Sequence, residues 1–279
     1  MKPRKIQLMG IVNLTDNSFF SASRRSGAAA VAAAWKLTEE GADVIDLGAS
    51  SSRPGAEPVA EAEEWKRLAP VLQELAGSGL RLSLDTTSSE VIRRAFDLYG
   101  PLMVNDISAG ATDPEMLPTA ARLGLPYIAM HMRGTPATMA ALTDYPEGIV
   151  QAIRQYFADF ARKAEAAGLQ EWILDPGYGF AKTLEQNWEL LSRQHELKAL
   201  GRPLLAGLSR KSMLYKPLGI TPEDALPATM TANFIALQQG ADWLRVHDIP
   251  AARQTVALYR LWEAGLTGAS ATGSNPDLH

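Results

Sequence analysis

The 279-residue chain contains no cysteine, so disulfide bonds and thiolate metal sites are excluded. No stretch approaches the roughly 18 consecutive apolar residues of a membrane-spanning helix. The basic start, MKPRKIQLMGIVNL, has a short apolar run that Asn13 interrupts, and no small-residue cleavage site follows it. We therefore interpret this start as a first strand rather than a signal peptide, and we expect a cytoplasmic protein.

The chain also has no excess of positive charge, since its formal net charge is −4. This balance gives no electrostatic reason to expect nucleic acid or a membrane surface as a partner. No linker divides the chain before its last residues, GLTGASATGSNPDLH, which have too few apolar side chains to fold. We expect one domain over residues 1–264 and a disordered tail over residues 265–279.

What the chain does have is a regular alternation of short β-rich runs and longer segments of helical period. Helical spacing is clear, for example, at Trp65, Leu68, Leu72 and Leu75. The predicted strands cover residues 6–12, 43–48, 81–85, 101–106, 126–131, 171–175, 203–208 and 242–247.

The predicted strands are continuously apolar, which is typical of parallel strands that are covered on both faces. Eight strand–helix units are the number found in a (β/α)₈ barrel. A doubly wound open sheet is the alternative, but it needs a switch point and usually has fewer strands. We expect an α/β fold, a single (β/α)₈ TIM barrel with its active site at the C-terminal ends of the strands.

Each predicted strand ends on polar residues, beginning with GIVNLTDNSFF, in which apolar side chains lead into Asn13. The later ends carry Asp46, Asp85, Asn105 with Asp106, His131, Asp175, the segment SRKS at 209–212, and Arg245 with His247 and Asp248. Caps and turns explain one or two such ends. They explain eight poorly, because polar groups crowded into one barrel mouth need partners.

Three of these residues, Asp85, Asn105 and Asp175, offer carboxylate and amide acceptors. Such a set suits a flat ligand that presents several N–H groups, for example an aminopyrimidine ring. His131 could equally be a packed histidine, and we assign it no role.

A second set, Asn13, Arg53, Arg245 and His247, suits an anion such as a phosphate or diphosphate. Mg²⁺ also fits here, because it commonly takes one or two protein oxygens and completes its shell with water and phosphate. Asn13 could then be its only protein ligand. The alternatives are a turn hydrogen bond for Asn13 and a solvated surface charge for Arg53.

Two further segments carry specific expectations. If Ser209 opens a helix, Arg210 and Lys211 lie in its first turn, where an anion at the backbone N–H groups would relieve the unfavourable dipole interaction. The glycines of DPGYGF do not match a dinucleotide-binding fingerprint. We expect them to bring the backbone close to a ligand, with Tyr178 and Phe180 beside it.

With these residues identified, the sequence resembles the dihydropteroate synthase family of pterin-binding TIM barrels. The matching motifs lie in the family's order between residues 8 and 248: MGIVNLT with SF, SSRPG, SLDT, VNDIS, MHMRGTP, LDPGYGF, LSRKS and RVHD. The resemblance implies that 6-hydroxymethyl-7,8-dihydropterin diphosphate condenses with p-aminobenzoate and releases pyrophosphate. It also implies Mg²⁺ as cofactor and a homodimer packed through the last helices.

Residue roles follow from the same resemblance. The pterin site would contain Asp85, Asn105, Asp175 and Lys211. The diphosphate site would contain Asn13, Arg53, Arg245 and His247, with Asn13 on Mg²⁺. The p-aminobenzoate site would contain Ser52, Pro54, Phe180 and Ser212, with Phe19 on a loop that closes over it. Asp85, Lys211, Arg245 and His247 would carry the catalytic step by stabilising the leaving group and the developing cation.

The chain departs from the family pattern in its first two loops. Asp16 and Asn17 stand where Pro-Asp is common, SASRRSG replaces an Asp-Gly-Gly segment, and GASSS replaces GGEST. These differences bear on loop closure and sulfonamide sensitivity more than on pterin binding. Two other functions remain open at this stage: a methyltetrahydrofolate-dependent methyltransferase barrel and a non-catalytic pterin-binding protein.

Overall fold

A computed structural model describes residues 4–14, 23–50, 55 and 59–267 of the chain. The expectations for Phe19, Ser52, Arg53, Pro54 and residues 268–279 therefore lie outside the described residues. No helix in the described ranges is long and apolar enough to cross a membrane.

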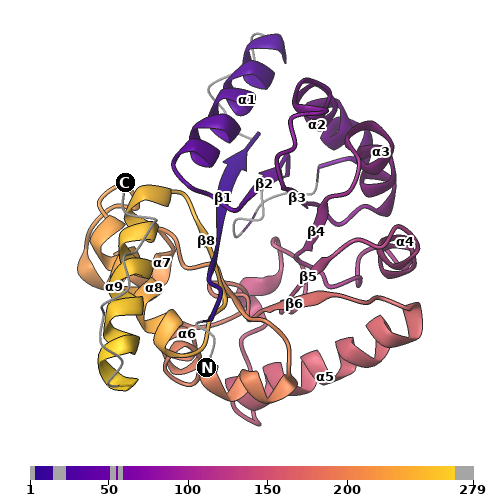
Figure 1. The fold of residues 1–279 in the computed structure, drawn as a ribbon. Helices are drawn as coiled ribbons and strands as arrows, with labels where there is room; N and C mark the ends of the chain where they lie inside the picture. The colour runs from indigo at the N-terminus through magenta and orange to yellow at the C-terminus, as the bar shows by residue number, and fades with distance from the viewer. Residues whose placement is uncertain (1–3, 15–22, 51–54, 56–58, 268–279) are drawn as a thin grey trace.

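Eight parallel strands form a single sheet in the order β6-β5-β4-β3-β2-β1-β8-β7. A parallel bridge between Leu174 and Leu204 joins β6 to the start of the β7 segment, which brings the two edges of the sheet together. Helices surround the resulting ring of strands (Figure 1). The expected (β/α)₈ barrel is therefore confirmed. The strands are β1 (Gln7–Asn13), β2 (Val44–Gly48), β3 (Leu82–Asp85), β4 (Met103–Asp106), β5 (Tyr127–Met130), β6 (Trp172–Asp175), β7 (Leu205–Ala206) and β8 (Trp243–Val246).

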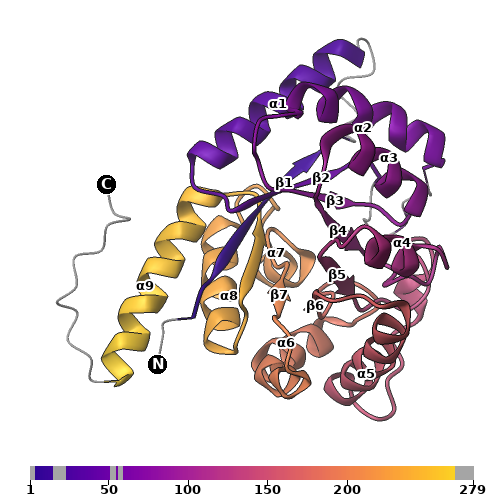
Figure 2. The same cartoon turned by 45° about the vertical axis from the view of Figure 1, so that its right-hand side comes forward.

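The last helix lies beside the first strand, so the two ends of the barrel sequence meet (Figure 2). This helix ends at Thr267, three residues beyond the predicted end of the domain. The α-helices are α1 (Ser23–Glu39), α2 (Glu61–Leu75), α3 (Ser89–Tyr99), α4 (Met116–Arg122), α5 (Ile149–Ala167), α6 (Leu184–Ser192), α7 (Ser212–Leu218), α8 (Leu226–Gln238) and α9 (Ile249–Thr267). Two 3₁₀ helices are η1 (Met139–Ala141) and η2 (Gln194–Leu200).

The buried apolar residues divide into two layers because successive strand residues face opposite sides of the sheet. The larger layer, which includes Ile45, Leu84 and Val104, packs between the strands and the helices. The smaller one fills the inside of the barrel and consists of Met9, Val44, Met103, Ile128, Ile173, Leu205 and Trp243. The inner layer forms a floor of apolar side chains below the C-terminal ends of the strands.

Candidate active site

The candidate site lies directly above the apolar floor. Because side chains alternate along a strand, the residue two positions after a floor residue also faces the barrel interior. This step leads from floor residues to Asp46 on β2, Asn105 on β4, Asp175 on β6, Gly207 after β7 and Arg245 on β8. Four of these five residues are polar, and the same step from the two remaining floor residues, Met9 and Ile128, leads to the apolar Ile11 and Met130. The strand period thus places a polar layer on top of an apolar one.

Arg245 is the centre of one half of this polar layer. Its Nε donates to Oδ2 of Asp46 at 2.6 Å, and its Nη2 donates to Oδ2 of Asp85 at 2.9 Å. Asn105 Nδ2 donates to the same Asp46 oxygen at 3.1 Å. Burial opposes the charge on Arg245, but Asp46 and Asp85 outweigh it and raise the pKa of the guanidinium. Arg245, predicted to hold an anion, is therefore paired with two carboxylates in this structure.

Asp46 was assigned no role from the sequence, although it lies at the base of this cluster. It sits in the middle of β2, at 0% exposure, rather than at the strand's end as predicted. Its other oxygen, Oδ1, has no hydrogen-bond partner among the described residues. The long-range pairing with Arg245 joins β2 to β8, and no local sequence pattern reports it.

Asp85 ends β3 next to Gly48 of β2 and Asn105 of β4. Burial raises the pKa of its carboxyl to about 7, against the lowering effect of the Arg245 guanidinium. Asn13 is close by: a Cβ added at Gly48 would lie 3.6 Å from Asp85 Oδ2 and 3.7 Å from Asn13 Oδ1. The exposed Asn13 side chain at the end of β1 therefore borders the carboxylate cluster.

The other half of the layer surrounds Gly207. A Cβ added there would lie 3.8 Å from Asp175 Oδ2, 3.9 Å from Lys211 Nζ and 4.0 Å from Arg245 Cβ. Lys211 Nζ donates to the carbonyl of Tyr178 and lies 4.7 Å from the centre of the Phe180 ring. Burial lowers the pKa of Lys211 to about 8, although Asp175 acts to raise it. The two halves meet at Gly207. The predicted pterin residues, Asp85, Asn105, Asp175 and Lys211, therefore lie together with Arg245 in one cluster, which we call the cup.

His247 lies at the outer part of the rim, where its side chain is exposed just after β8. Its Nδ1 is 2.9 Å from the hydroxyl of Ser209. Ser212, the first residue of α7, is half-buried on the same segment. The described part of the chain brings these residues to the same end of the barrel as Asp85 and Asp175.

The prediction for SRKS is wrong in one respect, because α7 begins at Ser212 and not at Ser209. Lys211 is the N-cap residue, and Arg210 adopts a positive φ of 54°. The Arg210 guanidinium makes two hydrogen bonds to Asp248, at 3.0 and 2.9 Å. Arg210 is therefore tied to the loop after β8, and only Lys211 of the two cations reaches the cup.

Three polar groups near the mouth carried no predicted role, of which Asp106 and Glu64 are buried and Lys182 is half-buried. Asp106, facing outward on β4, accepts hydrogen bonds from Tyr127, Ser108 and Gly110 and thereby fixes its own loop. Glu64 on α2 is 5% exposed, and burial raises the pKa of its carboxyl. Lys182, just before α6, has its Nζ 3.1 Å from Nδ1 of His131, which follows β5. Helical acids and loop lysines are common at surfaces, so the sequence offered no signal for these positions.

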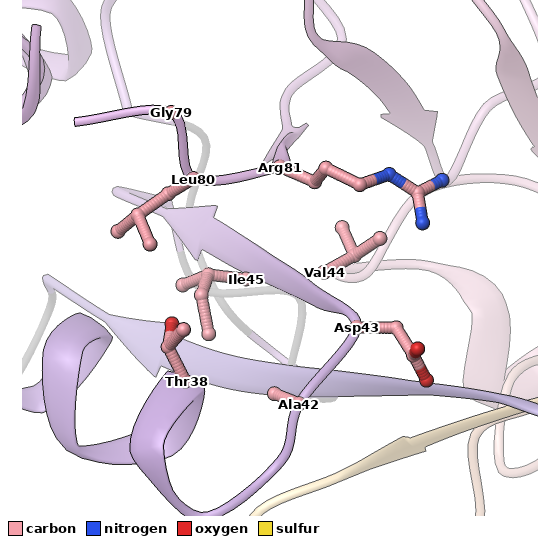
Figure 3. A pocket seen from close by; sticks show the side chains of 8 residues that line it. All are labelled: Thr38, Ala42, Asp43, Val44, Ile45, Gly79, Leu80 and Arg81. Atoms are coloured by element: carbon pink, nitrogen blue, oxygen red, sulfur yellow. The ribbon is translucent and has the colours of Figure 1, made fainter. Parts of the chain in front are cut away.

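A small cavity of about 190 Å³ lies at the opposite end of the strands, against Thr38, Asp43 and Arg81 (Figure 3). Val44 and Ile45 in its wall begin β2, and Leu80 and Arg81 precede β3. This is the N-terminal face of the barrel, where residues of this fold contribute to stability rather than to catalysis.

A metal ion would have few ligands from the protein. Within the described ranges, no group of three or more His, Asp or Glu side chains could hold one. The amide of Asn13 is the only predicted metal ligand, and it is a neutral oxygen donor of the kind that Mg²⁺ accepts. The donor set thus fits a magnesium ion whose remaining ligands are water and substrate oxygens.

Comparison with known proteins places this geometry in a family. Residues 9–247 match the family model described as pterin binding enzyme. The chain is 42% identical over 256 residues to dihydropteroate synthase of Synechocystis sp., with 90% of this chain and 88% of the relative covered. It is 37% identical over 264 residues to dihydropteroate synthase of Escherichia coli, with 93% and 92% covered.

Solved structures agree with the sequence relatives. Yersinia pestis dihydropteroate synthase, solved with a sulfonamide drug complex, superposes with a TM-score of 0.86 at 34% identity, covering 94% of this chain and 95% of that one. The Xanthomonas albilineans enzyme, solved with 4-aminobenzoic acid, superposes with a TM-score of 0.83 at 37% identity, covering 94% and 93%. The likeness extends over the whole barrel.

Proposed function

The chain belongs to the family of pterin-binding enzymes, and we propose that it is a dihydropteroate synthase. It would join 6-hydroxymethyl-7,8-dihydropterin diphosphate to p-aminobenzoate, giving 7,8-dihydropteroate and pyrophosphate in folate biosynthesis. This is a transferase reaction. The observation that carries the proposal is the convergence of Asp85, Asp175, Lys211 and Arg245 in one cup above the barrel floor.

The pterin would bind to the acceptors of the cup. Asp85 and Asp175 would accept from ring N–H groups, which are complementary to buried carboxylates. Asn105 donates to Asp46, which leaves its amide oxygen available as a further acceptor. Lys211 would donate to a ring acceptor on the side of Asp175. The ring would then supply further partners to the buried charges of the cup.

Catalysis would depend on charge stabilisation rather than on a protein nucleophile. When pyrophosphate leaves, the pterin methylene becomes cationic, and the carboxylates of Asp85 and Asp175 would stabilise that charge. Arg245 and His247 would stabilise the pyrophosphate. To bind a pyrophosphate oxygen, Arg245 would give up the hydrogen bond from its Nη2 to Asp85 and keep the hydrogen bond from its Nε to Asp46. Pterin binding would favour this exchange, because the ring would compete with Arg245 for Asp85.

Asn13 would hold Mg²⁺ together with the diphosphate oxygens, at the edge of the cup beside Asp85. When bound, the ion would neutralise the charge that develops on the leaving pyrophosphate. The p-aminobenzoate would lie against Phe180 and Ser212. The proposed roles of Arg53 in diphosphate binding, and of Ser52, Pro54 and Phe19 around p-aminobenzoate, rest on the sequence resemblance.

We also propose a homodimer. Leu258, Leu261 and Leu266 on α9 are each at least 60% exposed, and Trp262 beside them is 39% exposed. Their spacing places them along one side of the helix, which gives an apolar surface of the kind that a second copy covers. Figure 2 shows α9 at the outside of the barrel.

The activity can be tested by incubating the purified protein with the pterin diphosphate, p-aminobenzoate and Mg²⁺ and measuring pyrophosphate release. We expect release that depends on both substrates and that falls to near background in Lys211→Ala. Pterin binding without product would indicate a non-catalytic binding protein instead. Tight binding of methyltetrahydrofolate with indifference to Mg²⁺ would indicate a methyltransferase barrel.

A further inference from the structure

We propose that Lys182 and His131 are positioning residues that fix residues 177–180, and through them Lys211 and Phe180, in the geometry that the reaction requires. This inference rests on the proposed function. Lys182 lies just before α6 and His131 just after β5, so neither belongs to the strand-end acceptors of the cup. Their role would be indirect, through the loop between them.

The Lys182 ammonium uses all of its three protons. Its Nζ donates to the carbonyls of Gly177 at 2.7 Å and Phe180 at 2.9 Å, and it lies 3.1 Å from Nδ1 of His131. An ammonium has three donors, so the charged form of Lys182 directs one at each partner, although burial lowers the pKa of Lys182 well below its ordinary value and Asp175 acts to raise it. All three acceptors are neutral, which means that this lysine is not held in place by an ion pair with them. Its hydrogen bonds instead hold the carbonyls of the 177–180 loop around Nζ.

His131 is suited to be the third acceptor because its imidazole is neutral. The side chain is 1% exposed, and burial lowers its pKa well below the ordinary value, with the charge of Lys182 acting in the same direction. With Lys182 as an ammonium, Nδ1 accepts and the imidazole proton is assigned to Nε2. The ring is held by the edge of Tyr156 at a centroid distance of 4.8 Å. A protonated His131 could not accept this bond.

The loop that Lys182 holds has little freedom to adopt another shape. A Cβ at Gly177 would lie 2.1 Å from the carbonyl oxygen of His131, so the two segments are in direct contact. Ala181, which follows the loop, adopts a positive φ of 48°, and its carbonyl accepts from Tyr145 at 2.9 Å. Gly179 N donates to Asn187 Oδ1 at 2.7 Å. These contacts form a scaffold in which Lys182 is the central donor.

The same loop carries two contacts to Lys211. The carbonyl of Tyr178 accepts from Lys211 Nζ, and the Phe180 ring lies 4.7 Å from it. If the loop shifts, Lys211 loses a hydrogen-bond partner and Phe180 moves away from the site proposed for p-aminobenzoate. Displacements of about 1 Å at a distance from the chemistry can cost two orders of magnitude in rate. Removal of Lys182 should therefore affect p-aminobenzoate more strongly than the pterin, which Asp85 and Asn105 hold from the other side.

The test compares kcat and the two KM values in Lys182→Met, Lys182→Arg, His131→Asn and His131→Leu. We expect Lys182→Met to raise the KM for p-aminobenzoate by about tenfold or more and to lower kcat, while the KM for the pterin, which Asp85 and Asn105 also hold, rises by a smaller factor. Lys182→Arg should recover part of the loss. His131→Asn keeps an acceptor near the position of Nδ1 and should be close to wild type, whereas His131→Leu should resemble Lys182→Met. Lys163→Met, at an exposed position on α5, is the matched control and should change nothing.

Hydrogen exchange gives a readout that does not depend on activity. Amides of residues 177–181 should exchange faster in Lys182→Met and His131→Leu than in wild type and in Lys163→Met. The inference is overturned if the wild type is active and Lys182→Met keeps its KM for p-aminobenzoate, or if His131→Asn and His131→Leu behave alike. An inactive wild type would overturn the proposed function, while the exchange measurement would still decide whether Lys182 orders the loop.

Discussion

Arg245 shows how single residues determine the electrostatics of the barrel mouth. It forms ion pairs with two carboxylates, Asp46 and Asp85, which come from different strands and are both largely buried. Buried charges are costly unless they are paired, and loss of one partner leaves the other uncompensated. The cup is thus held together in the free protein by the same groups that would bind substrate. Its reactivity should depend on which of these groups is charged.

The pH dependence of kcat/KM should follow Asp85 and Lys211. The pKa of Asp85 is raised to about 7, so its carboxylate forms as the pH rises through that value. The pKa of Lys211 is lowered to about 8, so its charge is lost as the pH rises further. Because both charged forms are proposed to act, the profile should be bell-shaped with its maximum between these values. Steady-state kinetics over this range measure it.

Two variants identify the limbs of the profile. Asp85→Asn should remove much of the activity and leave only the acidic limb that Asp175 sets, because burial raises the pKa of Asp175 as well. Lys211→Arg should move the alkaline limb to higher pH, because a guanidinium keeps its charge. A flat wild-type profile through both pKa values would contradict these assignments.

Asp175→Asn should weaken pterin binding by about 1.5–3 kcal/mol, the range for loss of a hydrogen bond to a charged group. Titration calorimetry with a pterin ligand measures the change. Asp97→Asn, at an exposed position on α3, is the control and should bind like wild type. Equal affinity in Asp175→Asn and wild type would mean that Asp175 has only its structural bond to Gly177 N, at 2.8 Å.

At the scale of elements, α6 illustrates how a local signal determines where a helix begins. Thr183 is its N-cap and forms a capping box with Gln186, in which each side chain bonds to the other's backbone N–H. Thr183→Ala should lower the free energy of unfolding by about 1 kcal/mol. Thr231→Ala, at an exposed position inside α8, should be neutral or slightly stabilising, because alanine is the better helix former. Chemical denaturation of both variants tests the contrast, and equal effects would argue against the cap.

The strands were predictable from the sequence because their apolar runs are continuous and their number is high. All eight predicted runs overlap an observed strand, although β1 extends one residue beyond its run, to Asn13, and β7 contains only Leu205 and Ala206. The start of α7 was not predictable in the same way. Arg210 leaves the helix because its guanidinium reaches Asp248, a contact across 38 positions of the chain. Long-range hydrogen bonds of this kind have no local sequence pattern.

The candidate site residues were predictable where they lie at the ends of strands, since the alternation of side chains along a strand determines which of them face the barrel interior. Asp85, Asn105, Asp175 and Arg245 could be identified because they follow apolar runs at strand ends. Asp46 was noted at such an end but given no role, since nothing in the sequence indicates its pairing with Arg245. Lys182 was missed because its three acceptors come from the loop and from His131, 51 positions away. Burial of a charged group depends on tertiary packing, which the sequence does not display.

At the scale of the whole molecule, the exposed face of α9 predicts self-association. Leu261→Glu should convert a homodimer into a monomer, because a buried unpaired carboxylate at an interface is unfavourable. Sedimentation velocity distinguishes the two states. Leu184→Glu, on the exposed start of α6, is the control and should leave the dimer intact. A monomeric wild type at micromolar concentration would contradict the proposed interface.

The central claim is that one polar layer, set above an apolar floor by the strand period, binds the pterin. The most direct measurement is a crystal structure of the chain with a pterin ligand at saturating concentration. We predict that the ring N–H groups lie within hydrogen-bond distance of Asp85, Asn105 and Asp175, with Lys211 at the ring's edge. A pterin bound elsewhere on the molecule, or an empty cup at saturation, would contradict the account.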